Sequence, residues 1–192
     1  MKPTLLVREV LPFLLSLAGL FAATVLVDLV LHLLHAAWLG RYLGIPGVLM
    51  ILGSFGHSLR KRRVIRSGDP IRFLRVHEYV AWAGALLVLV HAGVHFNAVL
   101  AWLAVAAMLV NVSSGLTGKF LLRRAQGWLK QARADLREQG ASDAEIAADL
   151  HWDSLTVDAV RQWRTVHLPI ALAFAVLALA HIIAVVVFWG WR

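Results

Sequence analysis

The chain contains no cysteine among its 192 residues. Disulfide bridges, thiolate metal sites, cysteine-ligated iron–sulfur clusters and covalent haem attachment through thioethers are therefore excluded. The absence leaves the cellular compartment open, because a chain without cysteine is compatible with reducing and oxidising surroundings alike.

Charged residues are also scarce, at 16%, whereas 60% of the residues are hydrophobic and the mean hydropathy is +0.73. Soluble domains are far less apolar, and several apolar runs approach the roughly 20 residues that a membrane helix needs. We therefore expect an all-α polytopic membrane bundle of about five helices, forming a single domain over residues 1–192. The expected spans are Leu11–Leu34, Leu43–Leu59, Leu74–Phe96, Ala98–Leu116 and Val166–Trp189.

The second span is the least regular, because Pro46 and Gly47 interrupt its start. It is short enough to be a re-entrant or tilted helix. The first apolar run is too long for a cleavable signal peptide, and no small-residue cleavage site ends it. The chain has no room for a flavin, nicotinamide or iron–sulfur domain beside the bundle.

The 19 basic residues outnumber the 11 acidic ones, but their positions fit a membrane protein better than a nucleic-acid-binding protein. With a cytoplasmic N-terminus, all of them except Arg41 and Arg192 fall on the inner side. Positively charged loops stay in the cytoplasm, so we expect a bacterial inner membrane protein with its N-terminus inside and its C-terminus outside. The charge then serves topology and attraction to membrane lipid, and no nucleic-acid partner is expected.

A polar cytoplasmic segment at about residues 118–165 separates the fourth and fifth spans. Gly127–Gly140 is predicted to be a charged helix, and Ser142 with Glu145 forms a capping box that opens a second helix. A turn near His151–Ser154 and a third helix over Thr156–Trp163 are expected to follow. The segment weakly resembles a helix-turn-helix, but short amphipathic helices lying on the cytoplasmic membrane surface are the preferred interpretation.

Two pairs of histidines share one spacing. His77 and His91 lie fourteen residues apart in the third span, and His167 and His181 lie fourteen apart in the fifth. In a helix, fourteen residues return a side chain to within about 40° of its starting face and advance it by about 21 Å. Because both spans run from inside to outside, His77 would face His167 near the inner surface. His91 would face His181 nearer the outer surface.

Two clamps of paired imidazoles across a membrane are suited to two haems b, because neutral imidazoles ligate iron from both sides of the macrocycle. Gly84, midway between His77 and His91, would let a porphyrin edge approach the helix. Arg75 and Arg164 would neutralise haem propionates, although anchoring to lipid headgroups explains them equally well. Hydrogen bonding between packed helices is the alternative for the histidines, and their match in face and depth favours haem.

A second cluster lies near the outer end of the first span, where Asp28, His32 and His35 share one face. These side chains suggest a quinone pocket, a proton route or a metal site, and hydrogen bonding to neighbouring helices explains them equally well. His95 lies at a similar depth and would join the cluster. It is also an alternative to His91 as a haem ligand, because its spacing places it on the same face of the third span.

The chain resembles the dihaem membrane cytochromes b over its third to fifth spans, roughly half of its length. The resemblance is carried by Arg75-Val76-His77-Glu78, His91-Ala92-Gly93-Val94-His95, Trp163-Arg164-Thr165-Val166-His167-Leu168-Pro169 and His181. It is similar to the membrane part of ferric reductases and NADPH oxidases, and to the ligand spacing in cytochrome b of quinol–cytochrome c reductases. The resemblance implies that the four paired histidines are axial ligands. The chain lacks the flavin–nicotinamide domain of the first group and the length of the second.

These observations favour an electron-transfer subunit of an oxidoreductase over a complete enzyme. Such a subunit would link the quinone pool, or a cytoplasmic donor, to a redox partner protein outside, with electrons flowing in either direction. One alternative is a stand-alone ferric or other metal reductase that gathers its substrate at the cluster around Asp28. The other is a membrane transporter or regulator without haem.

Overall fold

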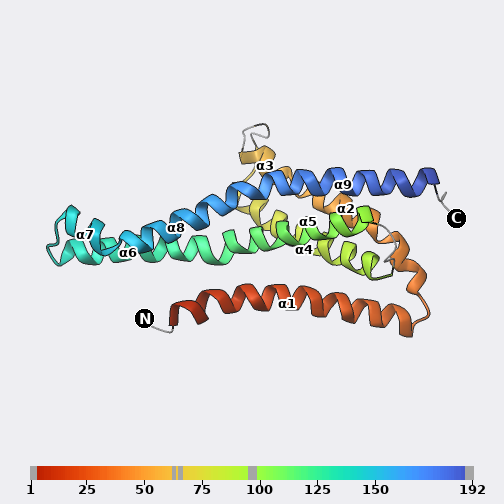
Figure 1. The fold of residues 1–192 in the computed structure, drawn as a ribbon, viewed down its shortest axis with the longest axis horizontal. Helices are drawn as coiled ribbons and strands as arrows, with labels where there is room; N and C mark the ends of the chain where they lie inside the picture. The colour runs from red at the N-terminus through yellow and green to blue at the C-terminus, as the bar shows by residue number, and fades with distance from the viewer. Residues whose placement is uncertain (1–3, 62–63, 65–66, 95–98, 189–192) are drawn as a thin grey trace. The chain divides into compact units, whose positions relative to one another are not determined.

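The computed structural model describes residues 4–61, 64, 67–94 and 99–188, and these residues contain helices and no strand. The predicted all-α class is therefore confirmed. Figure 1 shows the helical elements in chain order. They are α1 (Thr4–Leu33), η1 (Ala37–Tyr42), α2 (Gly44–Gly53), α3 (Gly56–Lys61), α4 (Pro70–Val94), α5 (Val99–Leu116), η2 (Thr117–Leu122), α6 (Arg123–Glu138), α7 (Asp143–Asp149), α8 (His151–Trp163), η3 (Arg164–Val166) and α9 (His167–Phe188).

Five helical stretches among the described residues are long and apolar enough to cross a membrane, as predicted. They are Val10–Leu33, Ala37–Arg60, Ile71–Gly93, Val99–Phe120 and His167–Phe188. Many of their large apolar side chains are exposed, including Val25 and Val187. Exposure of so much apolar surface to water would be unfavourable, whereas lipid tails solvate it. The chain is an integral membrane protein.

The second span is a broken helix, and it begins at Ala37 instead of the predicted Leu43. It consists of η1, α2 and α3, which meet at Leu43 and at Ser54–Phe55. Pro46 is tolerated because it lies in the first turn of α2, where a helix needs no amide donor. At the second break, the Ser54 hydroxyl donates to the Ile51 carbonyl oxygen over 2.6 Å. Such a bond competes with the backbone hydrogen bond that the Ile51 carbonyl oxygen would accept in a regular helix.

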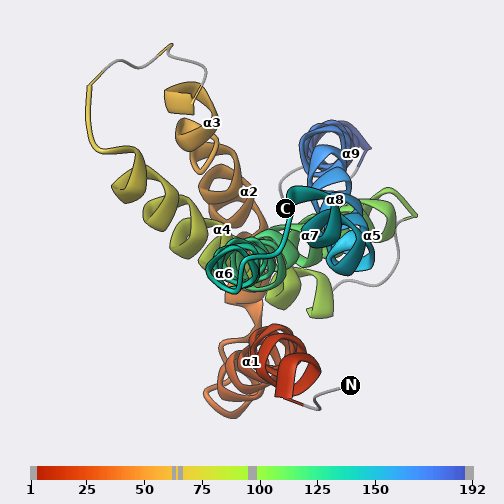
Figure 2. The ribbon, with the colours of Figure 1, turned by 90° about the vertical axis from the view of Figure 1, so that its left-hand side faces the viewer.

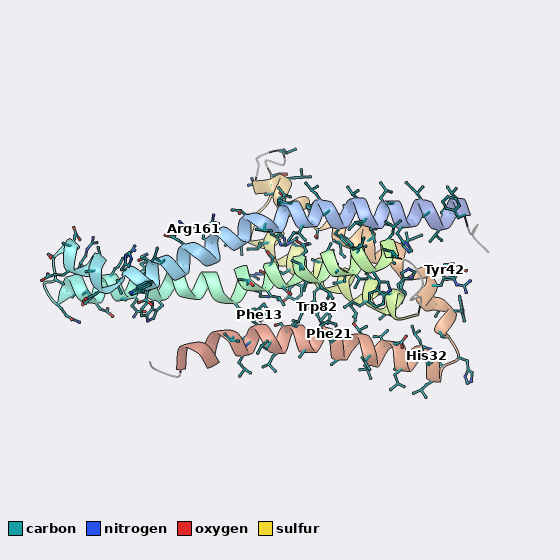
Figure 3. The ribbon with its side chains drawn as sticks, viewed as in Figure 1. Phe13, Phe21, His32, Tyr42, Trp82 and Arg161 are labelled. Carbon is teal, nitrogen blue, oxygen red and sulfur yellow. The ribbon has the colours of Figure 1, made fainter. Side chains whose placement is uncertain are left out.

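The chain folds as two compact units. The bundle unit comprises Ala18–Val112 and Ile170–Arg192, and the insertion unit comprises Met1–Leu17 and Ser113–Pro169. The core of the bundle unit draws residues from α1, α2, α4, α5 and α9. Its buried members are Leu20, Ile51, Ala85, Val88, Leu89, Ala104, Met108, Phe174 and Ala178. Trp82, labelled in Figure 3, packs against this core from α4.

In the bundle unit, α2 and α4 lie side by side (Figure 2). Their backbones approach closely at two glycines. A Cβ atom built on Gly84 would lie 2.8 Å from the Gly47 carbonyl oxygen and 2.8 Å from Cγ1 of Ile51. A Cβ atom built on Gly47 would lie 2.9 Å from the Gly84 carbonyl oxygen. Small residues at such contacts let membrane helices approach closely. This contact is a sufficient reason for glycine at both positions.

In the insertion unit, α6 confirms the predicted charged helix and begins four residues earlier than expected. Its apolar stripe packs against α7 and α8 in a small core of Leu129, Ile146, Leu150 and Val157, flanked by Ala132, Leu136 and Ala141. Gly140 follows the helix at a φ of +84°, and the Ala141 amide donates to the Leu136 carbonyl oxygen over 3.1 Å. This is the glycine-ended cap common at helix C-termini.

The predicted capping box at the start of α7 is confirmed. The Ser142 amide donates to the Glu145 carboxylate over 2.8 Å, and the Glu145 amide donates to the Ser142 hydroxyl over 3.4 Å. The bond from the Ser142 amide, followed by one from its hydroxyl, lowers the pKa of the Glu145 carboxyl below its ordinary value. The carboxylate form is thus the one that holds the helix start.

The predicted turn near His151–Ser154 is wrong, because α8 already begins at His151. The break between α7 and α8 is confined to Leu150, whose side chain is buried in the small core. The Ser154 amide then donates to the Leu150 carbonyl oxygen over 2.9 Å, and this helical bond continues the chain through the expected turn.

Replacing Gly84 with alanine is expected to lower the free energy of unfolding by about 1–3 kcal/mol, because the new methyl group would overlap the backbone of α2. Thermal unfolding of the detergent-solubilised protein measures the loss. Gly93→Ala is the matched control, since it lies on the same helix and no atom lies within 4 Å of its added Cβ. Equal stability of the two variants would contradict the close contact between α2 and α4.

The capping box makes the start of α7 sensitive to acid. Because the pKa of Glu145 is lowered in the folded state, its stabilisation is complete above the ordinary glutamate value of about 4.3. It is lost as the pH falls through the lower folded value. Protection of the α7 amides against hydrogen exchange should therefore stay constant from neutral pH down to about pH 4.3 and fall below it. Glu145→Gln should weaken protection at neutral pH and flatten its pH dependence, and an unchanged profile would rule out the role of the carboxylate.

Candidate functional site

The paired histidines lie on two continuous helices, as their spacing predicts. His77 and His91 both belong to α4, and His167 and His181 both belong to α9. Within each helix the two rings are separated by fourteen residues, which is about 21 Å of helical rise. Each helix therefore presents imidazoles at two heights.

The predicted outer pair is brought together in the bundle unit. The ring centroids of His91 and His181 lie 6.5 Å apart, and the ring planes meet at 59°. Both residues are half-buried. The two rings come from α4 and α9, which are not neighbours in the chain, so their approach is a property of the fold.

The His91 ring is held on its other side by the first part of the second span. Its Nδ1 atom lies 3.1 Å from the Gly40 carbonyl oxygen in η1. A carbonyl oxygen only accepts hydrogen bonds, so Nδ1 carries the hydrogen and the Nε2 atom of the neutral ring keeps its lone pair. The ring also packs on Gly44, where an added Cβ atom would lie 2.7 Å from Cδ2 of His91.

His77 is held in the same way by the second break of that span. Its Nδ1 atom lies 2.9 Å from the carbonyl oxygen of Ser54, a buried residue. In an unbroken helix the Ser58 amide would donate to this oxygen, but here it donates to the Phe55 carbonyl oxygen over 2.8 Å. The break therefore leaves an acceptor for the imidazole, and Nε2 of His77 is again the nitrogen with the lone pair.

The predicted inner pair joins residues of different units, because His77 belongs to the bundle unit and His167 to the insertion unit. Within the insertion unit, the His167 ring lies against Gly115 of α5. A Cβ atom built on this glycine would be 3.6 Å from Cε1 of His167. The pairing of His77 with His167 stays a prediction.

Gly84 and two arginines complete the predicted haem site. Gly84 is buried against α2, so its contact with Gly47 accounts for the missing side chain without a porphyrin. Arg75 is exposed on α4, two residues before His77. The side chain of Arg164 lies outside the described part of the chain. The roles of Gly84 beside a porphyrin and of both arginines at propionates stay predictions.

The predicted cluster on the first span is brought together only in part. Asp28 and His32 approach, with 3.6 Å between Oδ2 and Nδ1, and Nδ1 lies 2.8 Å from the Asp28 carbonyl oxygen. The other carboxylate oxygen, Oδ1, is buried and has no hydrogen-bond partner among the described residues. His32 lies near the C-terminal end of α1 in Figure 3. His95 lies outside the described residues.

His35 has a structural task that its place in the sequence does not reveal. It follows α1 with a φ of +54°, and the Ala36 amide donates to the Leu31 carbonyl oxygen over 2.7 Å. This arrangement is the left-handed cap that usually contains glycine. No three histidine, aspartate or glutamate side chains of the described residues form a metal-binding group. The metal interpretation of this cluster therefore gains no support there.

Three functional positions were missed by reasoning from the sequence: Gly40, Gly44 and Ser54. The glycines are four residues apart, a spacing common at close helix contacts, and this was the one available signal. Ser54 has no such signal, because its contribution is a backbone carbonyl that becomes available only where the helix breaks.

Comparison with known proteins finds no match, since no family model, no curated protein and no solved structure corresponds to this chain. The functional assignment therefore depends on the histidine geometry and on the membrane-spanning helices.

Proposed function

We propose that the chain is a membrane dihaem cytochrome b, an electron-transfer subunit with two bis-histidine haem sites at different depths of the bilayer. The observation that carries the proposal is the approach of His91 and His181, with ring centroids 6.5 Å apart. His77 and His167 would hold the second haem.

The separation of the two rings fits a metal ion between them. Metal–imidazole bonds of about 2.1 Å place two ligating nitrogens about 4 Å apart, and the ring centroids then lie roughly 6 Å apart. The observed 6.5 Å is close to this value. Two imidazoles in direct hydrogen-bonded contact would also be close, and the Nδ1–H tautomer of His91 is compatible with both arrangements.

The hydrogen bonds of the α4 histidines join packed helices, and they are also of the kind that metal-binding histidines make. Histidines that bind metals typically donate the hydrogen of one ring nitrogen to a carbonyl or carboxylate, which orients the ring and exposes the other nitrogen. His77 does so to Ser54 and His91 does so to Gly40. Two imidazoles on one membrane helix that both donate Nδ1–H to a backbone carbonyl are unexpected for residues that serve packing alone.

When bound between two histidines, a haem has no open coordination position, and it therefore carries electrons instead of binding oxygen or substrate at iron. The chain's own part is to hold the ligating nitrogens, to keep the rings in one tautomer and to surround them with apolar side chains. Val88, buried on α4 three residues before His91 and on the same side of the helix, would contribute to that surrounding. Two such sites about 21 Å apart along α4 would carry electrons across the membrane.

The proposed orientation follows from the basic residues. Of the 19 lysine and arginine residues, only Arg41 and Arg192 lie on the outer side when the N-terminus is cytoplasmic. The positive-inside rule supports this topology in a bacterial inner membrane. The His91–His181 pair would then lie nearer the outer surface.

The outer connections, residues 34–36 and 94–98, are too short to form a substrate-binding domain. A separate redox protein on the outer side therefore fits the proposal, with the quinone pool or a cytoplasmic donor at the other end. Asp28 and His32, which approach within 3.6 Å, are suited to exchanging protons with a quinone near that surface.

The proposal is tested by a reduced-minus-oxidised visible spectrum of the purified protein with haem quantified. Low-spin b-type bands and two haems per chain are expected. Replacing His91 or His181 with alanine should remove mainly one haem, and replacing His77 or His167 should remove mainly the other. His151→Ala is the matched control, because this exposed histidine lies on α8 and should leave both haems in place. A colourless protein, or two low-spin haems in every single variant, would contradict the assignment.

Gly44→Ala tests the positioning of His91. Its methyl group would overlap the His91 ring and move Nδ1 from the Gly40 carbonyl oxygen. Loss of such an orienting contact weakens metal retention by about tenfold or more. We expect lower occupancy of the haem that is lost in His91→Ala, with the other haem unchanged. The control is Gly53→Ala on the same helix, where no atom lies within 4 Å of the added Cβ. Equal haem content in both variants would show that the ring contact is irrelevant.

A further inference from the structure

A cleft runs between α6 and α8 in the insertion unit, and the electron-transfer proposal makes no use of it. Its volume is about 670 Å³, within the usual range for ligand sites. The two helices lie side by side in Figure 1, and Arg161 is labelled on α8 in Figure 3. The cleft is lined by Gln126, Leu129, Lys130, Arg133, Ala134, Arg137, Ser154, Val157, Asp158 and Arg161.

The cleft has an apolar floor and cationic walls. Leu129 and Val157 are buried members of the small core of this unit. Above them, Nη2 of Arg133 donates to the Ser154 hydroxyl over 3.2 Å, which links the two helices. Because its partner is neutral, the positive charge of Arg133 is not compensated by this bond.

The balance of charge in the cleft is strongly positive. Among the lining residues that the structure describes, Lys130, Arg133, Arg137 and Arg161 are cationic and Asp158 is the one carboxylate. Arg161 lies 3.6 Å from Asp158, but both side chains are about two-thirds exposed, at 66% and 67%, so this pair is weak. Arg137 pairs with Asp143 over 3.0 Å, and both of these side chains are also exposed. An anion would therefore find several donors available.

Both walls of the cleft continue along the chain into membrane-spanning helices. α6 follows α5 through η2, and α8 leads through η3 into α9. Arg161 precedes His167, the first residue of α9, by six residues. Lipid phosphates are concentrated at the ends of membrane helices, whereas a soluble phosphate compound has no such reason to meet this cleft.

We propose that this cleft binds the phosphate-bearing headgroup of an anionic phospholipid. Lys130 and the guanidinium groups of Arg133 and Arg161 would bind the phosphate oxygens, and the apolar floor would contact the glycerol and first acyl carbons. The site is independent of the histidines and of any haem.

The experiment uses the full-length protein in detergent, titrated with dioleoylphosphatidylglycerol and followed by native mass spectrometry. The double variant Lys130→Gln/Arg161→Gln removes two cations from the cleft, and Arg41→Gln/Arg72→Gln is the matched control that removes two cations elsewhere. Each basic side chain contributes about fivefold to binding of an anionic lipid, so the cleft variant should bind on the order of twenty-five-fold more weakly. Asp158→Asn should bind more tightly, because it removes the one lining carboxylate.

Dioleoylphosphatidylcholine is the lipid control and should bind weakly to every variant. sn-Glycerol 3-phosphate is the soluble competitor that carries the same phosphate group, and it should not displace the phospholipid at millimolar concentration. An equal loss of affinity for phosphatidylglycerol in the two double variants would overturn the proposal, because the effect would then reflect net charge alone. Efficient displacement by glycerol phosphate would also overturn it, in favour of a soluble phosphate ligand. Haem content should be unchanged in the cleft variant, so failure here is distinguishable from failure of the cytochrome proposal.

Discussion

Two hydrogen bonds from imidazole rings to backbone carbonyls tie the second span to α4 in the membrane bundle of this protein. A histidine within a bilayer needs a partner for its ring N–H, because lipid offers none. Here the partners are Gly40 and Ser54, whose carbonyls belong to a helix that is broken near both places. The irregular second span therefore orients both α4 imidazoles. The second break releases the Ser54 carbonyl from the Ser58 amide, whereas the Gly40 carbonyl accepts from the Leu43 amide over 3.3 Å as well as from the His91 ring.

That arrangement requires the second span to lie very close to α4. Gly47 and Gly84 allow backbone contact between α2 and α4, and Gly44 leaves room for the His91 ring. The glycines and the hydrogen bonds depend on each other, because a wider separation would take the carbonyls out of reach of the rings. The contact also orients the His91 ring while it lies 6.5 Å from His181. The packing of α2 on α4 and the orientation of the His91 ring thus depend on the same interface.

The parts of the structure that were predictable from the sequence are those set by local chemistry. Hydropathy located the five spans, helical periodicity placed His77 with His91 on one helix, and the Ser142 and Glu145 pair located the start of α7. The unpredicted features depend on packing between distant segments, such as the backbone contact of Gly84. Two local features were also missed, because His35 occupies a cap that normally favours glycine and because Leu150 is buried where a longer turn was expected.

The basic residues show how one feature of a membrane protein serves two purposes. Positive charge in the segment between the fourth and fifth spans supports the proposed topology, but topology requires only that the charges lie on the proper side. It does not require them to converge, and four of them line one cleft over an apolar floor. The acidic residues Asp143, Asp149 and Asp153 lie on α7 and the start of α8, which would repel nucleic acid from that end. The convergence is explained by a bound anion at the membrane surface, and this is why the cleft is assigned to a lipid headgroup.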